Sequence, residues 1–215
     1  MPIDLFENPE GTREEILAAA YRALCEHGYA DLTIGTIGQE FEKSPSLVYH
    51  YYEGKDELLV DFLEFMLDGF ETSVPDREFD DAHEQLQALI DHVFPDDLED
   101  ERRGFSGAML QLRAQAVQDP AYANHFTRSD RFFQARLVSI VERGIEEGVF
   151  REVDPEAVAA FLLTAINGAM YRRVTADVDE SIPAIREEIR IYVARRLLAE
   201  GGELTEATPD AQADR

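Results

Sequence analysis

Residues 33–59 read TIGTIGQEFEKSPSLVYHYYEGKDELL, and this stretch decides the fold. Thr33 predicts the N-cap of a short helix over about 34–41, because its hydroxyl can accept a hydrogen bond from an amide of the first turn. Ser44 followed by Pro45 predicts the start of a second short helix, since proline at the first helical position loses no hydrogen bond. The stretch ends in the apolar start of a third helix. This is the layout of a helix-turn-helix unit.

The second short helix carries side chains that suit the major groove of DNA. Its N-terminal end presents free N–H groups and a positive dipole, which favour a phosphate group. Tyr49 and His50 can donate hydrogen bonds to a phosphate or a base edge, and Leu47 can contact a thymine methyl group. The only two lysines of the chain, Lys43 and Lys55, flank this helix, where they can contact phosphates on each side of the groove.

This run resembles the DNA-binding domain of the TetR/AcrR family of transcriptional regulators, whose pattern is roughly T-I-x-x-I-A-x-x-A-G-V-S-x-x-x-L-Y-x-H-F-x-x-K-x-E-L. The resemblance covers residues 10–70. Residues 148–161, GVFREVDPEAVAAF, are similar to the join between the pocket helices and the first dimerisation helix of the family, and the C-terminal part is most similar to the BetI-type branch. The residues that match the DNA-binding pattern are Thr33, Ile34, Ile37, Ser44, Val48, Tyr49, Tyr52, Lys55, Glu57 and Leu58.

The resemblance implies a role in DNA binding for several positions. Phosphate contacts would come from Ser44, Tyr49 and Lys55, and Thr33 would cap the supporting helix and offer its amide to a phosphate. Tyr51 stands where the family has histidine and would also face the DNA. The residues nearest the bases would be Pro45, Ser46, Leu47 and His50. The complete set of predicted DNA-binding residues is Thr33, Lys43, Ser44, Pro45, Ser46, Leu47, Tyr49, His50, Tyr51 and Lys55.

The chain departs from the family pattern around the turn between the two short helices. Residues 41–43, Phe-Glu-Lys, replace Ala-Gly-Val, and the loss of glycine demands a left-handed conformation of Glu42 or a different turn. Gly38 replaces a small alanine, and Pro45 and Leu47 replace more usual polar residues. These changes bear on the target sequence and the affinity rather than on the fold.

The whole chain predicts an all-α protein of about nine helices, because no stretch alternates apolar and polar residues for long enough to predict a strand. A helix-turn-helix DNA-binding domain is expected over 10–70, a helical effector-binding and dimerisation domain over 76–200, and a disordered acidic tail over 201–215. Thr12 and Glu15 have the spacing of a capping box at the start of the first helix. The helices of the second domain are predicted over about 81–94, 103–118, 120–147, 155–175 and 181–200. Asp119-Pro120 and Asp154-Pro155 open two of them, and Gly28 is expected to end the first helix of the chain.

Apolar stripes on the helices of the second domain are more typical of a core than of a pocket. The resemblance implies that a small apolar or amphipathic effector lies among these helices. Arg113, a cation beside an apolar row, either pairs with a core carboxylate or orients an anionic ligand. The predicted effector-binding residues are Phe105, Met109, Arg113, Phe126, Phe133, Ile166 and Met170. The last two helices form the dimer interface in the family, and the dimer contacts predicted on them are Leu163, Gly168, Tyr171, Ile189, Tyr192 and Val193.

The acidic composition limits what the protein can bind. Asp and Glu total 45 against 20 Lys and Arg, which gives a formal net charge of −25 in 215 residues. Such a surface repels nucleic acid and anionic membranes at low salt. In molar salt the Debye length falls to about 3 Å, so that only groups at contact distance interact. We therefore expect a protein from a halophilic archaeon, whose affinity for DNA depends weakly or inversely on salt.

The sequence carries none of the common motifs of enzymes or metal sites. No GxGxxG, GxxxxGK[ST], HExxH or GxSxG run occurs, so we predict no catalytic residue, no metal and no cofactor. Cys25, the single cysteine, lies on an apolar helical stripe that is typical of a core. Because neither a signal peptide nor an apolar run of about 18 residues is present, we expect a cytoplasmic protein without a membrane span.

The sequence therefore predicts a ligand-responsive transcriptional regulator that is not an enzyme. A homodimer would bind a palindromic operator in double-stranded DNA, most simply as a repressor, and a small-molecule effector would release it. The competing class is an all-helical small-molecule-binding protein or hydrolase that does not bind DNA.

Overall fold

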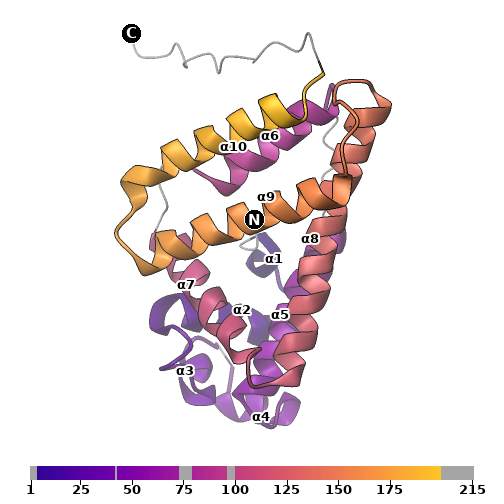
Figure 1. Cartoon of the computed structure of the whole chain (residues 1–215). Coiled ribbons are helices and arrows are strands. Elements are labelled where there is room, and N and C mark those ends of the chain that lie inside the picture. The colour runs from indigo at the N-terminus through magenta and orange to yellow at the C-terminus, as the bar shows by residue number, and fades with distance from the viewer. Residues whose placement is uncertain (1–3, 42, 73–78, 96–99, 200–215) are drawn as a thin grey trace, which may run out of the picture.

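The computed structural model describes residues 4–41, 43–72, 79–95 and 100–199, and most of these are helical (Figure 1). The predicted all-α fold is confirmed, since no β-sheet occurs in these four segments. The α-helices are α1 (Asp4–Glu7), α2 (Thr12–His27), α3 (Ile34–Gln39), α4 (Val48–Tyr51), α5 (Lys55–Thr72), α6 (Ala82–Val93), α7 (Asp100–Gln115), α8 (Pro120–Glu146), α9 (Pro155–Thr175) and α10 (Ile182–Arg196). The 3-10 turns are η1 (Pro45–Leu47) and η2 (Asp179–Ser181).

Helix α1 has no counterpart among the predicted helices. It places Phe6 over the first core, where the Phe6 ring stacks on Tyr21 at 5.0 Å and on Phe62 at 5.5 Å between ring centroids. The remaining helices, α2 to α10, are the nine expected from the sequence, with η1 and α4 together forming the second short helix of the helix-turn-helix unit.

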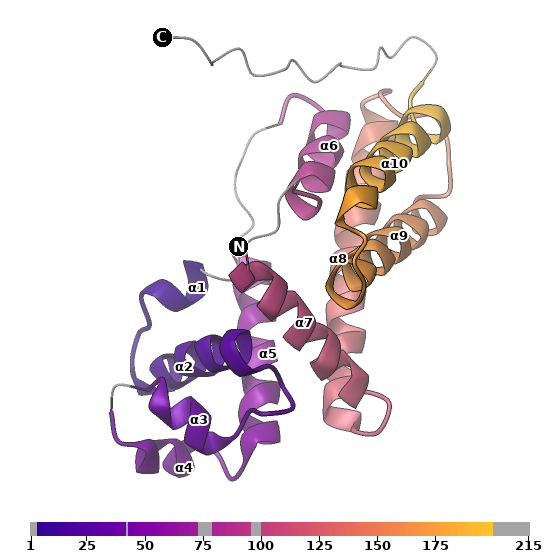
Figure 2. The same cartoon turned by 90° about the vertical axis from the view of Figure 1, so that its left-hand side faces the viewer.

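The first hydrophobic core joins the N-terminal helices to α7 and α8. Leu17 of α2 and Phe62 of α5 are completely buried at its centre, and Leu112 of α7 and Tyr122 of α8 belong to the same cluster. Figure 2 shows α7 lying between the N-terminal helices and the C-terminal ones. The DNA-binding unit expected over 10–70 therefore shares its core with α7 and α8. Because α7 packs on α2 in this core, we expect a shift of α7 to move α2 as well.

The second hydrophobic core lies between α6, the C-terminal half of α8, α9 and α10. Phe94, Val141, Leu162 and Val193 are buried in it with at most 1% of each residue exposed. The long helix α8 runs through both cores and connects them (Figure 1). An isolated β-bridge between Phe150 and Leu198 ties the end of the chain's last helical region to the α8–α9 connection.

The predicted helix starts at Asp119 and Asp154 are observed, but the one predicted at Thr12 is not. Asp119 and Asp154 each cap a helix through a side-chain oxygen, with proline at the next position as predicted. Helix α2 instead takes Gly11 as its N-cap, with φ of 97°, so Thr12 is already the first helical residue. The predicted capping box of Thr12 and Glu15 is therefore wrong. The helix expected over 181–200 ends at Arg196, and the tail expected over 201–215 lies outside the described residues.

Candidate DNA-binding site and effector region

The supporting helix of the helix-turn-helix unit is fixed by a reciprocal cap. Thr33 Oγ1 accepts a hydrogen bond from the Thr36 amide at 3.0 Å, and Thr36 Oγ1 accepts one from the Thr33 amide at 2.8 Å. Ile34 and Ile37 are buried on the inner face of the same helix. The predicted capping role of Thr33 is confirmed, and its partner Thr36 was not predicted.

The second short helix starts with a 3-10 turn before it becomes α4. Pro45 takes the first position of η1 as predicted, but Ser44 does not cap the helix with its side chain, because its hydroxyl pairs with the Ser46 hydroxyl at 2.8 Å. Val48 is completely buried and anchors the helix. Tyr49 is 64% exposed and Tyr51 is 46% exposed, so two aromatic side chains with free surface project from this helix.

A partly buried polar contact holds the end of α4 against α2 and α5. The Tyr52 hydroxyl donates to Asp61 Oδ2 at 2.6 Å, and Arg13 Nε donates to the same oxygen at 2.8 Å. Burial disfavours the charged carboxylate, but the hydrogen bonds from Arg13 and Tyr52 outweigh it and lower the pKa of Asp61. Burial together with the bond to Asp61 raises the pKa of the Tyr52 hydroxyl.

Both lysines, predicted as phosphate contacts, are engaged within the protein in this DNA-free structure. Lys43 forms an ion pair with Glu15 of α2. The Lys55 ammonium lies 4.3 Å from the centroid of the Tyr29 ring, and 3.4 Å from the carbonyl oxygen of Leu32. Each lysine must therefore give up a contact inside the protein when it reaches a phosphate, and the sequence did not reveal this.

Two of the departures from the family pattern lie against each other. A Cβ built on Gly38 would lie 2.8 Å from the Pro45 Cβ and 3.1 Å from its Cγ, closer than side-chain carbons approach. Glycine at 38 therefore makes room for proline at 45. The predicted left-handed conformation falls on Glu42, which lies outside the described residues.

The residues predicted to bind an effector do not line one cavity. Phe105 contacts Tyr21 of α2 with 5.2 Å between ring centroids, and Phe133 meets Phe70 of α5 edge-on at 5.7 Å. Met109 and Phe126 pack in the first core, while Ile166 and Met170 pack in or against the second. The apolar periodicity of the sequence indicates which residues face a core, but it does not show which apolar stripe of which helix faces a cavity.

A surface hollow of about 480 Å³ lies where α7, α8 and α9 meet. Arg113 of α7 forms an ion pair with Asp130 of α8 in its wall, and the Arg113 guanidinium lies 4.9 Å from the centroid of the Phe126 ring. Of the two interpretations of Arg113, pairing with a carboxylate is the one observed. The lining residues are Arg113, Asp130, Gln134, Ala160, Leu163, Thr164, Asn167, Gly168 and Tyr171.

The predicted dimer residues divide into three groups. Leu163, Gly168 and Tyr171 line the hollow. Ile189 and Val193 are 5% and 0% exposed and pack inside the protomer, so neither presents a surface to a partner. The Tyr192 ring contacts the Phe161 ring at a tilt of 33°, with 4.4 Å between ring centroids, and Phe161 is 48% exposed. The sequence does not single out Phe161 as a surface residue, because it adjoins the inward apolar stripe of α9.

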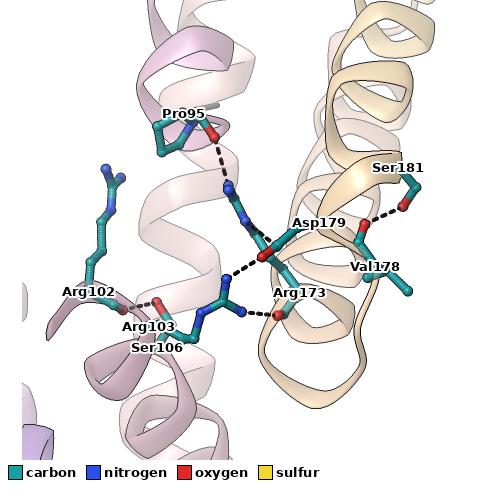
Figure 3. A network of polar contacts seen from close by, with 8 residues as sticks. All are labelled: Pro95, Arg102, Arg103, Ser106, Arg173, Val178, Asp179 and Ser181. Atoms are coloured by element: carbon teal, nitrogen blue, oxygen red, sulfur yellow. Dashed lines mark hydrogen bonds and ion pairs between the residues drawn. The ribbon is translucent and has the colours of Figure 1, made fainter. Parts of the chain in front are cut away.

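A network around a buried arginine joins the C-terminal end of α9 to α7 (Figure 3). Arg173, only 4% exposed, donates to Asp179 at 3.0 Å and to the Pro95 carbonyl at 2.8 Å. Arg103 of α7 donates to the Arg173 carbonyl at 2.8 Å and also pairs with Asp179. The hydrogen bonds from Arg103 and Arg173 lower the pKa of Asp179. The network is a structural clamp, and the adjoining cavity of about 20 Å³ holds no more than a water molecule.

Two further searches of the described residues bear on other classes of function. No group of three His, Cys, Asp or Glu side chains is placed so that it could hold a metal ion in this part of the chain. Among the described helices, none is both long enough and apolar enough to cross a membrane.

The capped helix α3 is joined by a tight connection to the exposed helix α4, and both lie beneath an all-helical domain (Figure 2). This arrangement defines a helix-turn-helix transcriptional regulator. The chain belongs to the TetR family. Residues 16–62 match the family model described as bacterial regulatory proteins, tetR family, and residues 82–198 match the one for the C-terminal part of BetI-type transcriptional repressors. The expected ligand-responsive DNA-binding repressor is confirmed at the level of this family.

Several known proteins resemble this chain over nearly its whole length. The crystal structure of a TetR transcription regulator from Haloarcula marismortui is 40% identical, covers 86% of this chain and 97% of its own, and superposes with a TM-score of 0.77. The HTH-type transcriptional repressor SCO4008 of Streptomyces coelicolor is 29% identical over 89% of this chain and 97% of its own length. A putative transcriptional regulator from Saccharomonospora viridis in complex with choline, 20% identical over 87% of this chain and 98% of its own, shares the fold with a TM-score of 0.76.

Proposed function

We propose that the protein is a homodimer that binds a palindromic operator through α3, η1 and α4 and that an effector releases it. The observation that carries this proposal is the exposure of Tyr49 and Tyr51 on a helix whose buried face is anchored by Val48. Large aromatic side chains with a polar tip are costly to expose without a partner, and their hydroxyl groups can bind phosphates or base edges. We place the dimer in the cytoplasm of a cell with molar salt, where repulsion between the acidic surface and DNA is screened.

The dimer contact that fits best is the outer face of α9 and α10. The contacting rings of Phe161 and Tyr192 offer an exposed aromatic surface there. A two-fold dimer would present two recognition helices about 34 Å apart, which matches half-sites one helical turn apart. Replacing Phe161 by Asp should shift sedimentation in 2 M KCl from dimer to monomer, whereas Val117→Asp, at an exposed turn residue, should not.

We propose the hollow between α7, α8 and α9 as the effector site. Its volume of about 480 Å³ lies in the range of small-molecule sites, and its wall carries the Arg113–Asp130 pair together with side chains of Gln134, Asn167 and Tyr171. An effector for this hollow is small and polar, rather than the apolar or amphipathic molecule expected from the sequence. A ligand that pairs with Arg113 in place of Asp130 would break the ion pair between α7 and α8 and loosen the contact between these helices. Helix α7 in turn packs on α2 of the DNA-binding unit.

The effector site can be tested before its ligand is known. A set of small polar metabolites would be screened for a rise in the thermal midpoint of the wild-type protein, of Arg113→Met and of Arg190→Met. The Arg190–Asp91 pair is a matched control, because it is similarly exposed but lies between α10 and α6. We expect compounds that stabilise the wild type and Arg190→Met but not Arg113→Met. A compound that stabilises all three variants equally would place the site elsewhere.

DNA binding itself is tested with the DNA upstream of the protein's own gene. Fluorescence anisotropy in 2 M KCl would compare the wild type with Tyr49→Ala and with Val117→Ala, a substitution at an exposed turn residue. We expect Tyr49→Ala to weaken binding about tenfold or more, because one lost charge-assisted hydrogen bond costs about 1.5–3 kcal/mol, and Val117→Ala to bind as the wild type does. Absence of binding at every salt concentration would favour the alternative, a helical small-molecule-binding protein or hydrolase.

A further inference from the structure

Tyr29 lies in the connection between α2 and α3 and is held by two other helices, α5 and α7. Its backbone N–H donates to Gln111 Oε1 of α7 at 2.8 Å. Its hydroxyl donates to Asp56 Oδ1 of α5 at 3.3 Å, and the same oxygen accepts a hydrogen bond from Tyr122 of α8 at 3.1 Å. Both the backbone and the side chain of Tyr29 are therefore positioned by helices that lie outside the α2–α3 connection.

Lys55 rests on Tyr29 through weak contacts. Its ammonium lies 4.3 Å from the ring centroid, while its distances to the carbonyl oxygens of Tyr29 and Leu32 are 3.5 and 3.4 Å. These two distances are long for hydrogen bonds, so the cation–π contact is the main interaction. A phosphate offers a shorter, charge-assisted bond. Moving the Lys55 ammonium from Tyr29 to a phosphate therefore costs little free energy, provided that Tyr29 holds the ammonium close to the phosphate position beforehand.

The same connection also sets the start of the supporting helix. It begins at Gly28, where φ is 68° and a built Cβ would lie 3.3 Å from Gln111 Oε1, and it ends at Thr33, the N-cap of α3. Leu32, just before this cap, is 1% exposed and fixed in the first core. The Gln111 side chain thus lies directly over a segment that carries both the start of α3 and the resting place of Lys55.

We propose that Gln111 and Tyr29 are positioning residues for operator binding, which they support without touching DNA. Gln111 fixes the Tyr29 backbone, and Tyr29 places the Lys55 ammonium for its phosphate. Gln111 stands two residues before Arg113 on α7, so that a shift of α7 caused by an occupant of the hollow reaches Lys55 through this contact. This inference rests on the proposed function, since it requires that Lys55 meets a phosphate.

A double-mutant cycle tests the inference. Operator affinity would be measured in 2 M KCl for the wild type, Gln111→Ala, Lys55→Ala and the double variant, with Gln111→Glu and Gln115→Ala as controls. Glutamate keeps an acceptor for the Tyr29 N–H, and Gln115 is the same residue one turn further on, where its side chain bonds the Gln111 carbonyl within the helix. Thermal midpoints of all variants would be recorded to separate folding from binding.

We expect Gln111→Ala to weaken operator binding about fivefold in the wild-type background and less than twofold in the Lys55→Ala background, as for residues that act through a shared contact. Gln111→Glu and Gln115→Ala should bind within twofold of the wild type. An equal loss in both backgrounds, or no loss in either, would overturn the inference and leave the proposed function intact. A wild-type protein that binds no operator at any salt concentration would overturn both.

Discussion

At the residue scale, the contact between Gly38 and Pro45 explains how this chain combines two unusual residues in one helix-turn-helix unit. The Pro45 ring occupies the space that an alanine methyl group would need at position 38. Proline there starts η1 with φ already set for a helix, and glycine at 38 lets the two short helices approach closely. The two substitutions are therefore best understood as one paired change.

Gly38→Ala should destabilise the protein. Alanine gains about 0.5–1 kcal/mol over glycine in a helix interior, but overpacking at a contact of 2.8 Å costs about 1–3 kcal/mol. We expect a net loss of about 1–2 kcal/mol in the free energy of unfolding, measured by denaturant titration. Gly35→Ala in the same helix is the control, because its Cβ would meet only Thr33 Oγ1 at 3.4 Å. Equal stability of the two variants would contradict the proposed contact.

His125 gives the protein a defined sensitivity to acid. It is 5% exposed on α8, and its Nδ1 has no hydrogen-bond partner among the described residues. Burial, assisted by the charges of Arg128 and Arg113 and opposed by that of Asp68, lowers the pKa of His125 to about 4. The unfolded chain therefore takes up this proton near pH 6.5, while the folded protein takes it up only near pH 4.

The free energy of unfolding should accordingly fall between about pH 6.5 and 4, because the unfolded state binds the additional proton in this interval. The His125 share of the loss is about 3 kcal/mol, at 1.36 kcal/mol for each pKa unit. It is measured as the difference between the wild type and His125→Leu in denaturant titrations at several pH values. Curves that stay parallel from pH 7.5 to 4 would show that His125 is not the group responsible.

At the element scale, α7 is the helix that connects the hollow to the DNA-binding unit. A Cβ built on Gly104 would lie 2.7 Å from the Cys25 carbonyl oxygen of α2, so the two helices touch there without a side chain between them. Further along α7, Phe105 contacts Tyr21 and Gln111 bonds Tyr29. We therefore expect a displacement of α7 to move α2 and the α2–α3 connection as well.

Gly104→Ala should separate α7 from α2. Because the obstructing atom belongs to the backbone of a helix, it cannot rotate away, and we expect a loss of about 1–3 kcal/mol in the free energy of unfolding. Gly107→Ala, one turn later on α7, has no atom within 4 Å of its built Cβ and should leave stability unchanged or slightly higher. Similar thermal midpoints for the two variants would argue against close packing of α7 on α2.

The elements themselves were largely predictable, because local chemistry determines them. Asp119 and Asp154 followed by proline fixed two helix starts, and Gly28 fixed the end of α2. The contacts between elements were less predictable. The pairing of Lys43 with Glu15 and the burial of Ile189 depend on which helix faces which, and periodicity in one helix carries no information about its neighbour.

At the scale of the whole molecule, the formal net charge of −25 leads us to expect that the protein works at high salt. Many of the described arginines pair with acidic residues of the protein itself, as in the pairs of Arg13 with Asp61, Arg128 with Asp68 and Arg190 with Asp91. Each pair balances one arginine against one carboxylate, so the excess of carboxylates keeps the net charge of the protein negative. We therefore expect DNA binding to rest on close contacts from Tyr49, Tyr51 and Lys55 rather than on a basic surface.

Stability should increase with salt over the range in which this repulsion is screened. The Debye length falls from about 10 Å at 0.1 M to about 3 Å at 1 M. We therefore expect the thermal midpoint to rise between 0.1 and 3 M KCl, with most of the increase below about 1 M. A midpoint that is flat over this range would contradict the assignment of the acidic surface to a high-salt cytoplasm.

The most direct test of DNA recognition by α3 and α4 is a DNA-selection experiment with the purified protein in 2 M KCl. A pool of random duplexes would be selected with the wild type and, in parallel, with Tyr49→Ala. We expect the wild type to enrich a palindrome whose half-sites lie about 10 base pairs apart, and Tyr49→Ala to lose this enrichment. A wild-type selection without any enriched sequence, or the same palindrome selected by both proteins, would contradict this expectation.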